Sequence, residues 1–90
     1  MPLPQDIKVE FEGIASQASL VAFTNKLGLS RTDEVGQSAV YKGNPWGLAV
    51  EIRERWRDPS NVYSPQVDKH EAVLLLNGNA VATIRFFGNS

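Results

Sequence analysis

The residue types that carry most enzyme and metal chemistry are scarce in this chain. There is no cysteine and a single histidine, His70, so neither a cysteine-based zinc site nor a two-histidine metal site can form within one chain. Asp68, His70 and Glu71 cluster in the sequence, but neighbouring strand residues point to opposite faces, so His70 and Glu71 cannot readily share an ion. We therefore expect His70 to be a solvated residue at the start of a strand; the alternative is a metal-binding or acid–base role. Paired carboxylates occur as Glu10 with Glu12 and Glu51 with Glu54, and we interpret both pairs as solvent-facing strand residues. No glycine motif matches a phosphate-binding loop. We therefore predict no catalytic residue, no metal site, no cofactor and no enzyme activity.

Arginine and tryptophan are concentrated in one segment instead. In an extended chain Arg53, Arg55 and Arg57 share one face and Trp56 lies on the other, and arginine and aromatic residues are enriched at protein interfaces. Two further large aromatic residues lie in connecting segments, Trp46 in a predicted turn and Tyr63 in a predicted long loop. At such positions an aromatic side chain gains little from packing unless it folds back onto the domain or contacts a partner. We predict a partner-binding surface made of Trp46, Arg53, Arg55, Trp56, Arg57 and Tyr63. The alternative is a solvated sheet face on which the arginines pair with nearby acids.

The elements that must position these residues are read from periodicity. Apolar and charged residues alternate from Ile7 to Glu12, which predicts a half-buried strand that ends at Gly13. Ser16 is a plausible N-cap for an amphipathic helix over residues 17–27, with Gly28 in the position of a C′ glycine. A polar loop over residues 30–36 leads to a short strand over 38–42.

Turn residues divide the rest of the chain. Gly43 to Gly47 predicts a hairpin tip, and an extended segment follows in which Leu48, Val50, Ile52 and Trp56 share one face. Glu54 interrupts that apolar face. Two prolines then indicate a loop of about ten residues that reaches Asp68.

The strongest local signal is a β-hairpin over residues 71–87 around Asn77-Gly78-Asn79. A three-residue turn pairs Glu71 with Arg85, Val73 with Thr83 and Leu75 with Val81, which satisfies the charges. A two-residue Asn-Gly turn would shift the register by one residue and place Glu71 opposite Ile84, so we favour the three-residue turn. The opposite face then gathers the apolar residues Ala72, Leu74, Leu76, Ala80, Ala82, Ile84 and Phe86.

Length and composition complete the fold prediction. The 90 residues are 42 % hydrophobic and 21 % charged, as in an ordinary globular protein, and suffice for one domain over residues 1–90. Consecutive strands joined by short turns are antiparallel. We predict an α+β domain with an antiparallel sheet of about four to five strands and one α-helix packed on a face, in the order β-α-β-β-β-β.

The segment from Asp68 to Arg85 resembles the mid-fold hairpin of the acyl-coenzyme A-dependent N-acyltransferase superfamily. The matching features are the acidic start, the apolar strand, the Asn77-Gly78-Asn79 turn and the strand that ends in Thr83-Ile84-Arg85. In that superfamily a pyrophosphate-binding loop follows this hairpin, whereas here the sequence stops at Ser90, and Ala82 stands where a glycine is usual. The resemblance covers about a fifth of the chain and implies at most a divergent fragment without activity, so we expect no coenzyme A binding.

These observations give a ranked set of function hypotheses. The first is a non-catalytic protein-binding module, such as a small inhibitor, an immunity or anti-defence protein, or an accessory subunit. The second is a nucleic-acid binder that uses the arginine face, which is less favoured because acids are interleaved with the arginines and the net charge is −1. We also expect a homodimer in which Phe86 and Phe87 take part in self-association. The absence of cysteine and of a long apolar segment predicts a cytoplasmic protein that does not bind membranes.

Overall fold

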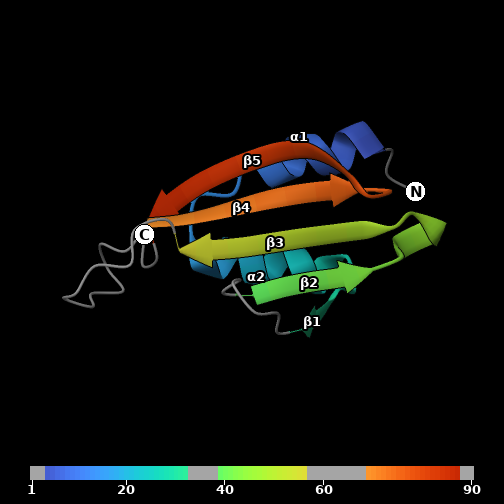
Figure 1. Cartoon of the computed structure of the whole chain (residues 1–90), viewed down its shortest axis with the longest axis horizontal. Helices are drawn as coiled ribbons and strands as arrows, with labels where there is room; N and C mark the ends of the chain where they lie inside the picture. The colour runs from blue at the N-terminus through green and yellow to red at the C-terminus, as the bar shows by residue number, and fades with distance from the viewer. Residues whose placement is uncertain (1–3, 33–38, 57–68, 88–90) are drawn as a thin grey trace.

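Two helices precede a five-stranded antiparallel sheet in the computed structural model, which describes residues 4–32, 39–56 and 69–87 (Figure 1). The strands lie side by side in chain order, and both helices lie behind the sheet in this view. The elements are α1 (Pro4–Glu12), α2 (Gln17–Lys26), β1 (Ser30–Thr32), β2 (Ala39–Gly43), the 3-10 turn η1 (Pro45–Gly47), β3 (Val50–Trp56), β4 (Lys69–Leu76) and β5 (Asn79–Phe87). The prediction of a small α+β domain with an antiparallel sheet is confirmed.

The first element is a helix, so the predicted strand over residues 7–12 is wrong. Ile7 and Phe11 are buried four residues apart, and Ile14 extends the same stripe, whereas Val9 is 68 % exposed. A strand would have placed Val9 on the same face as Ile7 and Phe11. Pro4 as the first helical residue and Asp6 in the first turn are helix signals that the alternation concealed.

The second helix agrees with the prediction. Ser16 caps it, because its Oγ accepts a hydrogen bond from the backbone N–H of Ser19 while the Ser19 hydroxyl lies within hydrogen-bond distance of the Ser16 backbone N–H. Leu20, Phe23 and Leu27 are buried. Gly28 follows with φ +70°, a left-handed backbone angle that glycine adopts without steric cost.

The sheet contains one strand that the sequence analysis assigned to a loop. Ser30–Thr32 pairs antiparallel with β2, with Arg31 opposite Tyr41, and forms one edge of the sheet. All three of its residues are exposed, so it carries no apolar alternation by which a strand could be recognised. The observed order is therefore α-α-β-β-β-β-β, and two helices cover the sheet where one was expected.

The β4–β5 hairpin has the two-residue turn of one predicted hairpin and, away from the turn, the strand register of the other. Asn77 and Gly78 have φ values of 52° and 84°, and Leu76 pairs with Asn79, so the turn has two residues. A register shift between Leu74 and Leu75 then leaves Val81 as an extra residue on β5. Leu75 pairs with Ala80, which corrects the predicted partner Val81. Beyond the shift, Val73 pairs with Thr83 and Glu71 with Arg85, as predicted.

The core lies between the sheet and the two helices. Val50, Ile52, Leu74, Ile84 and Phe86 point from the sheet into this layer and meet Phe11, Leu20 and Phe23 from the helices. Helix α1 packs against β5 and β4. Neither helix in the described part of the chain is long and apolar enough to cross a membrane.

Candidate functional site

The face of the sheet turned away from the helices carries most of its charged side chains. We call it the open face; it is the face toward the viewer in Figure 1. Strand register and alternating burial assign to it every second side chain of β2, β3 and β4 and their partners on β5, where the bulge at Val81 interrupts the alternation. These residues are Val40, Lys42, Glu51, Arg53, Arg55, Glu71, Val73, Leu75, Ala80, Thr83 and Arg85. Val40 is fully buried, so Lys42 is the accessible residue of this face on β2, and the rest of the accessible part lies over β3, β4 and β5.

Charges on the open face are arranged in two cross-strand groups. Glu51 forms ion pairs with Arg53 on its own strand and with Lys42 on β2, the latter at 4.0 Å from Nζ to Oε1. Glu71 accepts a hydrogen bond from Nε of Arg85 at 3.2 Å. Arg55 lies opposite Glu71 in the register, is exposed, and forms no ion pair with any described residue.

The cations of this face are more exposed than its acids. The side chains of Lys42, Arg53 and Arg85 are 49, 36 and 63 % exposed, whereas those of Glu51 and Glu71 are 23 and 19 % exposed. The described residues of the face contain four cations and two acids, on a chain whose net charge is −1. The outer layer of the open face is therefore cationic, and the acids lie beneath it.

Trp46 stands at the end of the sheet where β2 turns into β3. It adopts a left-handed backbone angle, φ 53°, within the turn Pro45–Gly47, and 52 % of its surface is exposed. A hollow of about 190 Å³ beside this turn is lined by Asn44 and Gly43 and also by Lys42 and Glu51. The hollow joins the turn to the near end of the open face.

The structure separates some predicted interface residues and adds others. Trp46 precedes β3 and Arg55 lies near the end of that strand, so the two cannot form one compact patch. Arg53 and Arg55 share the open face with Arg85, which lies two strands away on β5, and Glu71 of β4 stands between Arg55 and Arg85. Trp56 ends β3 opposite His70, but its side chain lies outside the described part of the structure. Arg57 and Tyr63 lie outside the described residues.

The two phenylalanines proposed for self-association, Phe86 and Phe87, occupy different positions in the structure. Phe86 is 7 % exposed and belongs to the core of the single chain, where its ring stacks on His70 with centroids 5.3 Å apart. Its side chain can reach a second copy only if the core opens. Phe87 ends β5, the strand at the edge of the sheet, and its side chain lies outside the described residues.

A buried polar cluster on the helix side was missed by the sequence analysis. Glu54 and His70 are 2 and 7 % exposed, and Nδ1 of His70 lies 2.9 Å from Oε2 of Glu54. Gln17 donates from Nε2 to Oε1 of Glu54 at 3.3 Å. The expectations that His70 is solvated and Glu54 solvent-facing are therefore wrong. In the alternation of their strands both residues fall on the core-facing side. A glutamate and a histidine on the same buried face are expected to contact each other, and this is the signal that could have predicted the pair.

Tyr41 responds electrostatically to this cluster. Burial raises the pKa of its phenol, the negative charge of Glu54 raises it further, and Arg31 on β1 lowers it. Among the described residues no group of three or more histidine, cysteine or acidic side chains is arranged to hold a metal ion. The cluster thus consists of one carboxylate with two hydrogen-bonding partners in the layer between sheet and helices.

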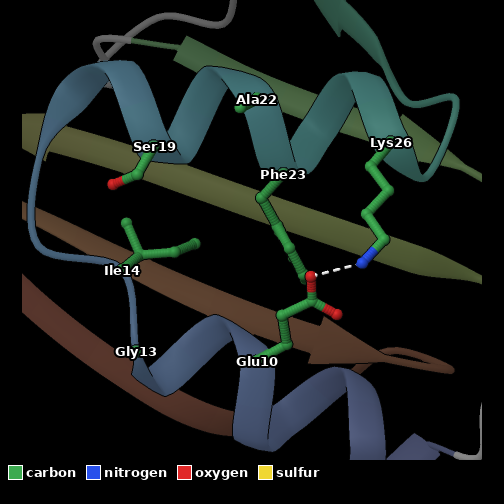
Figure 2. A pocket seen from close by; sticks show the side chains of 7 residues that line it. All are labelled: Glu10, Gly13, Ile14, Ser19, Ala22, Phe23 and Lys26. Carbon is green, nitrogen blue, oxygen red and sulfur yellow. Dashed lines mark hydrogen bonds and ion pairs between the residues drawn. The ribbon is translucent and has the colours of Figure 1, made fainter.

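The two helices enclose a groove of about 300 Å³ (Figure 2). Ile14 and Phe23 line it and are themselves 8 and 4 % exposed. Glu10 of α1 and Lys26 of α2 form an ion pair across the groove, with Nζ 2.6 Å from Oε1. The groove therefore lies where the two helices pack against each other, and the ion pair spans it.

Comparison of the chain with protein-family models, curated proteins and solved structures finds no match.

Proposed function

We propose that this chain is a non-catalytic protein-binding module whose binding surface is the open face of the sheet. The observation that carries the proposal is the contrast between the two faces. One face is covered by both helices, while the other presents half-buried Val73 and Leu75 among exposed arginines. Arginine is enriched at protein interfaces, and the buried centre of an interface is more apolar than the rest of the protein surface. A small inhibitor, an immunity or anti-defence protein, or an accessory subunit would each use such a surface.

Position-specific crosslinking tests this proposal in the cell of origin. A photoreactive phenylalanine analogue at Thr83, which is exposed on the open face, is expected to crosslink to a protein other than a second copy of this chain, as judged by the mass of the crosslinked product. The same analogue at Val21, which is exposed on α2, is the matched control. Crosslinks from position 83 should disappear when Arg55→Ala and Arg85→Ala are combined with it. Equal crosslinking from both positions, or crosslinking that ignores the arginine substitutions, would count against the open face.

Nucleic-acid binding is the second hypothesis, and the structure offers it less support. The arginines of the open face are interleaved with Glu51 and Glu71, whose negative charges repel phosphates.

The cytoplasmic location expected from the cysteine-free sequence remains part of the proposal.

A further inference from the structure

The open face combines three features that together specify the chemistry of a partner. Its outer layer is cationic, because the arginine and lysine side chains are more exposed than the two acids they contact. Arg55 is an exposed cation that no described residue neutralises. Val73 and Leu75 are half-buried on the same face, opposite Arg53 and Glu51 respectively.

Charge complementarity selects a partner with surplus carboxylates. Each additional cation–carboxylate contact at such a face is individually weak, yet several together steer the encounter and fix the orientation of the partner. Arginine suits this purpose because its guanidinium holds a carboxylate through two parallel hydrogen bonds. A partner that also carries apolar side chains would cover Val73 and Leu75.

We infer that the open face binds an acidic protein segment, with its carboxylates on Arg53, Arg55 and Arg85 and its apolar side chains on Val73 and Leu75. This inference rests on the proposed function and adds the class of partner. A nucleic acid fits less well, because the negative charges of Glu51 and Glu71 repel phosphates. The half-buried aliphatic side chains also make no favourable contact with a charged phosphate backbone. Nucleic-acid binding is kept as an outcome of the test.

Titration of isotope-labelled protein with defined probes, followed by amide chemical shifts, tests the inference. The probe is a peptide of about ten residues that alternates glutamate and valine, long enough to cross the sheet. A lysine–valine peptide of equal length and a single-stranded DNA of about ten nucleotides are run beside it. The glutamate peptide should shift open-face amides of β3 to β5 in a saturable manner and should weaken as salt rises to about 0.5 M. The lysine peptide should leave these amides unchanged.

Matched double variants separate location from net charge. Arg55→Ala with Arg85→Ala should weaken binding of the glutamate peptide by about tenfold. Lys8→Ala with Lys26→Ala removes two positive charges from exposed side chains on the helices and should change binding by less than about twofold. Thermal unfolding checks that both variants remain folded.

Four results would overturn the inference: no binding of the glutamate peptide, shifts that map to the helices, equal weakening by the two double variants, or tighter binding of DNA than of the glutamate peptide. Crosslinking from position 83 is the independent readout of the proposed function. If these crosslinks form and depend on the arginines while the glutamate peptide fails to bind, the open face binds protein but the acidic partner is wrong. If the crosslinks also fail to form, both the acidic partner and the proposed protein-binding function are wrong.

Discussion

At the scale of single residues, the most consequential feature is the carboxylate buried beneath the sheet. Glu54 is held by His70 and Gln17, and a buried charge that loses a hydrogen-bonding partner retains its full desolvation cost. The open face presents the opposite case. Its ion pairs are partly exposed to solvent, where water screens them and their net contribution to stability is small.

A double-mutant cycle distinguishes these two cases. Glu54→Ala and His70→Ala should each lower the free energy of unfolding by about 3 kcal/mol, because each leaves a buried polar group without its partner. The double variant should lose about 1 to 2 kcal/mol less than the sum of the two. Urea denaturation measures all values. The Glu71–Arg85 pair, with a 63 % exposed arginine side chain, is the control and should couple by less than about 1 kcal/mol. Additive losses at Glu54 and His70 would show that the two do not interact.

Tyr41 predicts a pH dependence on the alkaline side. Because burial and Glu54 raise the pKa of its phenol in the folded state above the unfolded value near 10.0, the folded chain keeps this proton longer than the unfolded chain does. The resulting stabilisation is complete below pH 10 and is lost as the pH rises through the folded-state pKa. Tyr41→Phe should therefore flatten the fall in unfolding free energy as the pH rises from 10.0 through the raised folded-state pKa of this phenol. Parallel curves for the two proteins would contradict this.

At the scale of elements, helix α1 shows how a short sequence pattern misleads. Ile7, Val9 and Phe11 fit a two-residue period, whereas Ile7, Phe11 and Ile14 fit the helical stripe that the core requires. Over six residues both periods account for most positions, and Val9 alone decides between them. By contrast, the cap at Ser16 and the Asn77-Gly78 turn were predictable because each depends on local backbone chemistry.

Alanine substitutions in α1 test this assignment directly. Ile7→Ala should lower the free energy of unfolding by about 2 to 4 kcal/mol, since it leaves a cavity in the core. Val9→Ala is the matched control and should change it by less than about 0.5 kcal/mol, because Val9 points to solvent. Both values come from urea denaturation followed by tryptophan fluorescence. Similar losses for the two variants would favour the strand that places both residues on one buried face.

The hairpin illustrates why register is hard to predict. Charge matching between Glu71 and Arg85 was sufficient to choose the correct pairing for most of the hairpin, yet it required a turn of the wrong length. The chain satisfies both the favoured Asn-Gly turn and the charge pair by inserting one unpaired residue, Val81. A bulge leaves no mark in the alternation of neighbouring residues, so either of two regular hairpins was the natural prediction.

Deletion of Val81 is a sharp test of the bulge. Without it, Ala80 and Ala82 become consecutive and keep their partners Leu75 and Leu74, so every other pair of the hairpin survives. The expected cost is the packing of one partly buried valine, about 1 kcal/mol in unfolding free energy. Cross-strand amide contacts in an NMR spectrum should still join Glu71 to Arg85. A deletion variant in which that contact moves by one residue would show a different register.

At the scale of the whole molecule, the two sheet edges differ in a way that favours self-association at one of them. The edge strand β1 has three residues, all exposed and polar. The opposite edge, β5, has nine residues, and Arg85 is the one charged side chain among them. Long edge strands with little charge are the ones that pair with other chains, whereas short polar edges are protected. The central position of β3 removes the arginine-rich strand from any edge.

The predicted homodimer therefore pairs β5 with β5 of a second copy about a two-fold axis. Antiparallel pairing centred on Thr83 places Arg85 opposite Val81 of the second copy, whereas pairing centred on Arg85 would oppose two like charges. In the first register the two Thr83 side chains meet at the axis, so Thr83→Glu and Thr83→Lys should each be monomeric by light scattering. An equal mixture of the two variants should recover a dimer, because glutamate then faces lysine. Thr32→Glu on β1 is the control and should leave the dimer intact. A wild-type mass of one chain at high concentration, or a mixture that stays monomeric, would contradict pairing through β5.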